Sequence, residues 1–99
     1  MTPSAAALAS TNDIPVGGGK ILAEEGIVLT QPEPGQYKAF SAVCTHAGCT
    51  VATVESGTIN CPCHGSKFRL ADGTVAKGPA TRPLAQTPIA VTGTTITRA

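Results

Sequence analysis

The sequence predicts an all-β domain of about eight to ten short antiparallel strands, arranged as a small sandwich or barrel. From Ile14 onward, short apolar runs alternate with turn residues. The chain holds 8 prolines and 11 glycines, and no part of it shows the period of about 3.6 residues that an amphipathic helix requires. Gly-containing dipeptides between β-favouring runs predict hairpins. They occur at Ser56-Gly57, Asp72-Gly73 and Thr92-Gly93.

The expected strands are the β-favouring runs that the turns separate. In the first half of the chain, Glu-Glu-Gly and Gln-Pro-Glu-Pro-Gly divide them, and in the second half the three hairpin dipeptides do so. The strands are expected at residues 19–23, 27–30, 36–43, 50–54, 58–60, 67–71, 74–76, 84–91 and 94–98. The run Val-Gly-Gly-Gly-Lys at 16–20 lacks the spacing of a phosphate-binding loop, so we expect it to begin a strand or form a bulge.

The composition divides the chain into a leader and one domain. Residues 1–12 are rich in Ala, Ser and Thr without periodicity, so they predict a flexible leader. Residues 13–99 are expected to form the single domain. The leader has neither the basic region nor the apolar run of a signal peptide, and no stretch approaches the roughly 20 apolar residues that span a bilayer. We therefore expect contact with a membrane only through a missing anchor or a partner.

Two features of the composition bear on function. The chain has no Trp, 1 Tyr, 2 Phe and 1 Met, and a core so poor in aromatic residues usually needs a metal, a disulfide or a partner for stability. The formal net charge is +1, and Lys and Arg are scattered singly without aromatic residues between them. This pattern argues against nucleic acid as a partner.

All 4 cysteines and both histidines lie in two short boxes, CTHAGC at 44–49 and CPCHGS at 61–66. Thiolates and imidazoles are ligands for zinc, copper and iron–sulfur clusters. The hairpin expected at 50–60 would bring the two boxes side by side at one end of a sheet. Loops on a rigid β scaffold are common places for functional sites.

The residues alone leave several interpretations of the boxes open. Two structural disulfides are compatible with four cysteines in a small exported domain, although they leave the histidines unexplained. A zinc site with two Cys and two His is also possible, although like ligands are not grouped as in common zinc spacings. Cys61-Pro62-Cys63 is not the Cys-x-x-Cys of a thiol redox motif. Zinc or disulfides would make the chain a stabilised binding module without redox chemistry.

The paired spacings Cys44-x-His46 and Cys61-x-x-His64 resemble the Rieske iron–sulfur family, in which two His replace two Cys on one iron of a 2Fe–2S cluster. The resemblance implies a Rieske-type antiparallel β-sandwich with a small cluster-binding subdomain at about 43–68 and a Rieske-type 2Fe–2S cofactor. It also implies metal-binding roles for four residues. Cys44 and Cys61 would bind the inner iron, and His46 and His64 the outer iron.

The remaining residues of the boxes refine the resemblance. Cys49 and Cys63 stand where the disulfide-bearing, cytochrome bc-like branch carries a disulfide, and the whole chain is most similar to small exported actinobacterial Rieske proteins. Ser66 matches the family serine that donates a hydrogen bond to a cluster sulfide. Phe68 departs from the high-potential relatives, which carry a tyrosine that donates to a ligand cysteine. Residues 78–83 resemble the proline-containing loop that shields the cluster.

The resemblance implies electron transfer, either as a carrier or as a subunit of a respiratory-type chain. The partners would be redox proteins, namely a cytochrome, a quinol-linked complex or an oxidase subunit. The alternative redox function is the electron-transfer component of an oxidase or oxygenase system. Since no residue suggests substrate chemistry, we expect an electron-transfer protein or oxidoreductase subunit more than a stand-alone enzyme. The disulfide implies an exported protein, in the periplasm or on the outer face of the cytoplasmic membrane.

Overall fold

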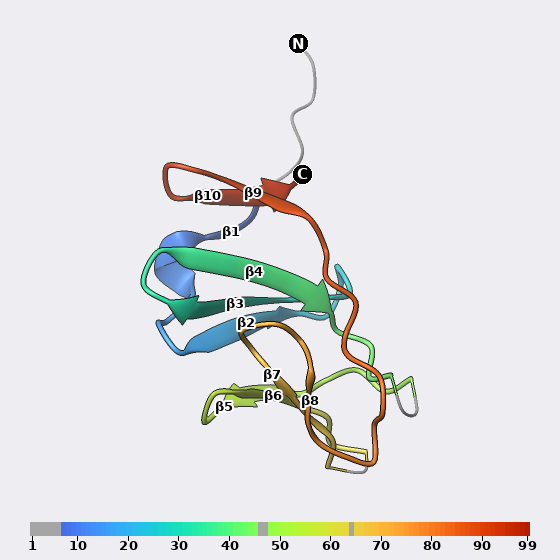
Figure 1. Ribbon diagram of the computed structural model, residues 1–99. Coiled ribbons are helices and arrows are strands. Elements are labelled where there is room, and N and C mark those ends of the chain that lie inside the picture. Colours follow the sequence, from blue (N-terminus) through green and yellow to red (C-terminus); the bar gives the residue numbers. More distant parts are fainter. Residues whose placement is uncertain (1–6, 46–47, 64) are drawn as a thin grey trace.

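The computed structural model describes residues 7–45, 48–63 and 65–99, and these residues form three antiparallel sheets (Figure 1). The prediction of an all-β antiparallel fold is confirmed. The elements are β1 (Ala7–Ser10), the single-turn 3-10 helix η1 (Thr11–Asp13), β2 (Gly18–Leu22), β3 (Ile27–Glu33), β4 (Gln36–Ser41), β5 (Thr53–Glu55), β6 (Thr58–Asn60), β7 (Lys67–Arg69), β8 (Val75–Lys77), β9 (Ile89–Thr92) and β10 (Thr95–Arg98). No helix in this described part of the chain is long and apolar enough to span a membrane.

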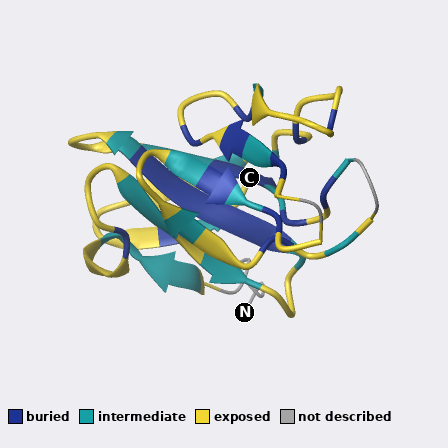
Figure 2. Cartoon of the chain, turned by 90° about the horizontal axis from the view of Figure 1, so that it is seen from below, coloured by how far each residue is buried: buried dark blue, intermediate teal, exposed yellow. Residues whose placement is uncertain are grey.

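The three sheets are stacked, with one in the centre. We call them the terminal sheet (order β1-β10-β9), the central sheet (β2-β3-β4) and the four-stranded sheet (β5-β6-β7-β8). One buried cluster lies between the terminal and central sheets, and a larger one lies between the central and four-stranded sheets. Figure 2 shows the buried inner strands in dark blue and the exposed turns in yellow.

Strand β3 is buried on both of its faces because it lies in the middle of this stack. Successive side chains of a strand point to opposite faces. Accordingly, Val28 belongs to the larger cluster, whereas Ile27 and Leu29 belong to the smaller one. A Cβ on Gly19 of β2 would overlap the Leu29 carbonyl oxygen. The glycine run at 17–19 therefore begins a strand that approaches its neighbour closely.

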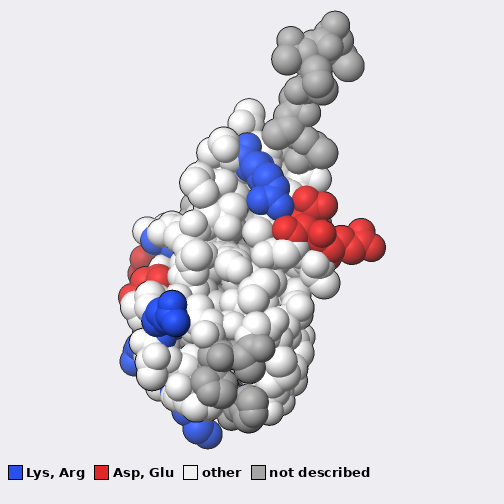
Figure 3. Space-filling model, turned by 90° about the vertical axis from the view of Figure 1, so that its right-hand side faces the viewer, with Lys and Arg blue, Asp and Glu red and all other residues white. Residues whose placement is uncertain are grey.

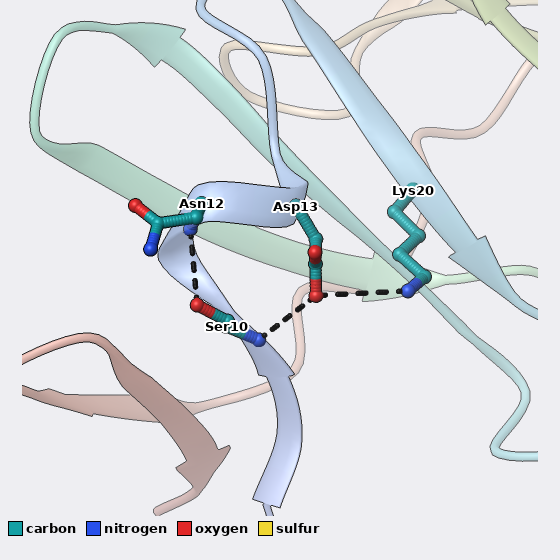
Figure 4. Close-up of polar contacts among 4 residues, drawn as sticks. All are labelled: Ser10, Asn12, Asp13 and Lys20. Atoms are coloured by element: carbon teal, nitrogen blue, oxygen red, sulfur yellow. Dashed lines mark hydrogen bonds and ion pairs between the residues drawn. The ribbon is translucent and has the colours of Figure 1, made fainter.

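The N-terminal segment corrects the prediction of a flexible leader over residues 1–12. That prediction is wrong for residues 7–12, because β1 pairs with β10 and η1 follows it. Ser10 caps η1, since its hydroxyl accepts the Asn12 N–H at 3.2 Å and its own N–H donates to the Asp13 carboxylate (Figure 4). Lys20 lies 3.8 Å from the same carboxylate. Residues 1–6 lie outside the described residues.

The three predicted hairpin turns are confirmed. Ser56 and Gly57 join β5 to β6 with φ angles of 54° and 78°, the left-handed region that a tight hairpin needs. The Thr92-Gly93 turn joins β9 to β10. The longer β7–β8 turn is held by Thr74, whose N–H and hydroxyl donate to the Asp72 carboxylate and lower the pKa of that group.

The segment 78–88, which we call the strap, connects the four-stranded sheet to the terminal sheet along one side of the molecule (Figure 1). Along its length it forms backbone hydrogen bonds to the β7–β8 turn and to β4. These bonds are Leu84 N–H to Gly73 O, Ser41 N–H to Ala85 O and Thr87 N–H to Ala39 O. The strap thereby fixes the position of the four-stranded sheet relative to the central sheet.

Candidate metal centre

The two Cys/His boxes fold as two loops with the same backbone pattern. In the first loop, Cys44–Cys49, the N–H of its first residue donates to the carbonyl of its last at 2.7 Å. The second loop, Cys61–Ser66, is closed by the equivalent bond at 2.9 Å. Gly48 and Gly65 occupy matching positions and have φ angles of 73° and 80°. Because L side chains rarely adopt this conformation, each loop needs glycine just before its closing residue.

A disulfide joins the two loops. The bond links Cys49 of the first loop to Cys63 of the second, with their Cα atoms 6.5 Å apart. This confirms the predicted disulfide and the prediction that the two boxes lie side by side. Cys44 and Cys61 lie outside this bridge, one at the start of each loop.

Cys44 and Cys61 are both buried, with exposed fractions of 2% and 3%. They belong to the larger core cluster, together with the aromatic rings of Phe40 and Phe68. Each cysteine opens its loop and is anchored through the closing hydrogen bond described above. Burial in apolar surroundings raises the cost of a thiolate unless a cation or metal compensates its charge. Two buried cysteines at the base of two bridged loops thus form a donor set suited to a metal centre.

The strap is held against both loops by side-chain hydrogen bonds. The hydroxyl of Ser66, which is fully buried, accepts the Ala80 N–H at 3.1 Å. Because the acceptor side of this hydroxyl is engaged, its own proton remains available to donate. In the first loop, the Thr45 hydroxyl donates to the Arg82 carbonyl at 2.7 Å. The sequence predicted a loop at 78–83 near the site, but it gave no indication of these particular contacts.

Not every predicted site residue falls in the described part of the chain. His46 and His64 lie outside it, so their roles as ligands stay predictions. Among the residues described, no three His, Cys, Asp or Glu side chains are grouped to hold a metal ion. The residues are nevertheless compatible with a 2Fe–2S cluster. Each of the two bridged loops supplies one buried thiol, and the second loop also supplies the Ser66 hydroxyl, which can donate a hydrogen bond.

Changing Ser66 to alanine is expected to destabilise the protein and to lower the reduction potential. The potential should fall because the hydrogen bond that the family resemblance predicts from this hydroxyl to a cluster sulfide would be lost. The variant leaves the buried Ala80 N–H without an acceptor, which costs about 1–3 kcal/mol of the free energy of unfolding. Chemical unfolding and voltammetry measure the two effects. Ser41→Ala is the matched control, since its hydroxyl accepts the Val43 N–H at 3.2 Å in an exposed position. Equal effects of both substitutions would contradict a special role for Ser66.

Comparison with known proteins identifies relatives over most of the chain. Residues 5–88 match the family model described as the Rieske [2Fe-2S] domain. The cytochrome b6-f complex iron-sulfur subunit of Chlorobaculum tepidum is 40% identical over 82 residues, which cover 81% of this chain and 45% of that protein. The chain thus spans less than half the length of this relative.

Solved structures with the same fold include Rieske proteins and ferredoxins. The cyanobacterial plasma membrane Rieske protein of Synechocystis PCC 6803 has a TM-score of 0.69 and 29% sequence identity, covering 95% of this chain and 98% of that one. The ferredoxin of carbazole 1,9a-dioxygenase from Nocardioides aromaticivorans has a TM-score of 0.73 and 21% identity, covering 98% of each chain. The second likeness is one of fold alone.

Proposed function

Because the chain belongs to the Rieske [2Fe-2S] domain family, we propose that it transfers electrons through a Rieske-type cluster and works as a carrier or subunit of a respiratory-type chain. The 2Fe–2S cluster, when bound, supplies a one-electron couple. The observation that carries the proposal is the Cys49–Cys63 disulfide, which ties the two loops together. The sequence resemblance associates this disulfide with the cytochrome bc-like branch.

In this proposal, Cys44 and Cys61 hold the inner iron and His46 and His64 hold the outer iron. The burial of both cysteines supports the inner assignment, because the inner side of the site must exclude water. The Ser66 hydroxyl donates a hydrogen bond to the cluster. This role is supported by the bond from the Ala80 N–H, which the hydroxyl oxygen accepts, because the hydroxyl proton can then donate to another group. The strap covers the loops through its bonds to Ser66 and Thr45.

The partners in this proposal are a quinol-linked complex or donor protein on one side and a cytochrome on the other. The Chlorobaculum relative, a subunit of a cytochrome b6-f complex, supports this class of partner. The alternative is electron transfer to an oxidase or oxygenase, which only the likeness in fold to a dioxygenase ferredoxin favours. A disulfide persists in oxidising compartments. We therefore place the protein in the periplasm or on the outer face of the cytoplasmic membrane.

The test is the electron paramagnetic resonance spectrum and midpoint potential of the purified, iron-loaded protein. A reduced sample is expected to give the rhombic signal of mixed Cys and His ligation, with a midpoint between about −150 and +300 mV instead of about −400 mV. Cys44→Ala and Cys61→Ala should each abolish the signal. The control, Thr50→Ala, changes an exposed residue next to the first loop and should retain it.

A colourless, silent sample that contains zinc would contradict the redox function and favour the stabilised binding module. A cluster that survives both cysteine substitutions would contradict the assignment of ligands while leaving the family function intact. Oxidation of the reduced protein by a c-type cytochrome then separates the two redox classes. Rapid oxidation supports the respiratory-type chain, and its absence favours an oxygenase partner.

A further inference from the structure

We propose that the loops of the candidate metal centre and the strap form a cationic docking surface for a redox partner whose contacting face is rich in carboxylates. We call the three cations of this surface, Lys67, Lys77 and Arg82, the cationic rim. The inference rests on the proposed function, since it names the chemistry of the partner that electron transfer requires. It is carried by the distribution of charge, by strand register and by the contacts of the strap.

Charge is divided unevenly along the chain. The formal net charge is only +1. No Asp or Glu occurs in the two loops, in the residues that flank them or in the first part of the strap, that is, in segments 42–51, 60–67 and 77–84. The only Lys and Arg residues in these segments are those of the cationic rim. All the carboxylates lie elsewhere, at Asp13, Glu24, Glu25, Glu33, Glu55 and Asp72. The segments that adjoin the loops therefore carry positive charge, and no acidic residue within these segments offsets it.

Figure 3 agrees with this division. On the face drawn there, the Asp and Glu side chains lie in the upper and middle parts of the molecule. Of the charged side chains, only Lys and Arg show at the lower end of this face; the four-stranded sheet, which lies at that end in Figure 1, also carries Glu55 on β5. A cluster held by two thiolates and two neutral imidazoles carries little net charge of its own. We therefore expect the rim, as the charged residues next to the two loops in sequence, to set the sign of the electrostatic potential there.

Strand register places two of the rim cations directly opposite each other. Lys67 on β7 pairs with Lys77 on β8, and like charges in this arrangement destabilise a sheet. The Lys67 ammonium lies 3.2 Å from the Asn60 amide oxygen, a neutral acceptor. Among residues 7–45, 48–63 and 65–99, the carboxylate ion pairs are those of Lys20 and Arg98, far along the chain from the rim. An acidic partner would relieve this repulsion.

The third rim cation is placed by the strap. Its backbone carbonyl, that of Arg82, accepts the Thr45 hydroxyl of the first loop at 2.7 Å, and its side chain is exposed. Two residues earlier, the Ala80 N–H is bound to Ser66 of the second loop. The guanidinium is therefore attached to a backbone that touches both loops. Just before the first loop, Val43 is 47% exposed and offers an apolar contact. A charged rim around a small apolar centre is the usual composition of an interface.

The first experiment measures the sign of the potential at the site with inorganic oxidants. The reduced, cluster-loaded protein is mixed with ferricyanide, an anion, or with tris(phenanthroline)cobalt(III), a cation. Raising the salt from about 0.01 M to 1 M shortens the screening length from about 30 Å to 3 Å. The rate with ferricyanide should fall and the rate with the cobalt complex should rise. Opposite or absent salt effects would overturn the proposal.

Charge-reversal variants locate the effect. Arg82→Glu and Lys77→Glu should each lower the ferricyanide rate at low salt, and together by about tenfold, while the rates converge at high salt. The matched control is Lys20→Glu, which changes the net charge equally on β2, outside the loops and strap. The absorbance and resonance spectra of every variant are recorded first. An intact cluster separates failure of the docking surface from failure of the proposed function.

The final experiment uses a polymeric carboxylate and does not depend on electron transfer. Poly-L-glutamate should bind the protein in fluorescence anisotropy, and Arg82→Glu/Lys77→Glu should weaken that binding at least as strongly as it slows ferricyanide. Vesicles of phosphatidylglycerol and phosphatidylcholine distinguish a membrane from a protein. Binding to the vesicles but not to poly-L-glutamate would overturn the proposal in favour of an anionic lipid surface. Equal binding of the polymer by the rim variant and the wild type would overturn it as well.

Discussion

Replacing Cys49 and Cys63 together with serine is expected to lower the free energy of unfolding by about 3 kcal/mol. The bridge closes a chain segment with a sequence separation of 14, and a loop of this size loses substantial entropy in the unfolded state when it is cross-linked. The bridge is also the covalent link between the two loops. We therefore expect the variant to release its cluster faster than the wild type does.

Denaturant unfolding gives the change in stability, and loss of the visible absorbance at fixed denaturant gives the rate of cluster release. Wild-type protein treated with dithiothreitol is the appropriate control, since it breaks the same bond without changing the sequence. The strap limits the damage, because the bonds of Ala80 to Ser66 and of Thr45 to Arg82 remain in the variant. If the double variant keeps both the stability and the cluster lifetime of the wild type, the bridge does not support the site.

The features that were predicted correctly from the sequence are local. The turn residues Ser56-Gly57 and Thr92-Gly93 specify their own backbone conformation, so the hairpins they form could be placed without knowing the rest of the fold. The β5–β6 hairpin then brings the two Cys/His boxes together, because the boxes precede and follow it directly. The disulfide and the position of the two loops side by side therefore followed from motif spacing and one hairpin.

The features that were missed depend on contacts between distant segments. The sequence of β1, Ala-Leu-Ala-Ser, has only a weak strand pattern. It forms a strand because it pairs with the edge of β10, which lies near the other end of the sequence. The stacking of three sheets depends likewise on β3 being buried on both faces. The bond from Ala80 to Ser66 joins a backbone amide, which any residue but proline would supply, to a loop 14 positions earlier. No residue type in the strap marks such a contact.

Replacing Phe68 with tyrosine is expected to raise the reduction potential, by at most about 130 mV, because only the part of the hydrogen-bond energy that differs between the two oxidation states shifts the potential. Phe68 is fully buried and belongs to the same core cluster as Cys44 and Cys61. In the high-potential branch that the boxes resemble, a tyrosine at this position donates to a ligand cysteine. A hydrogen bond to a charged group contributes about 1.5–3 kcal/mol, and about 1.4 kcal/mol corresponds to 59 mV for a one-electron couple. Such a bond stabilises the reduced state, which carries more negative charge on sulfur.

Phe40→Tyr is the matched control for this substitution. Phe40 is equally buried in the same cluster, but a Cβ built on Gly73 in the β7–β8 turn would lie 2.9 Å from its ring, which places the ring beside that turn. A buried hydroxyl without a partner costs stability, so the control should destabilise the protein and leave its potential unchanged. Voltammetry and chemical unfolding on both variants separate the two effects. An unchanged potential in Phe68→Tyr would mean that the new hydroxyl does not reach a ligand sulfur, and the missing hydrogen bond at Phe68 would then not lower the potential of this protein.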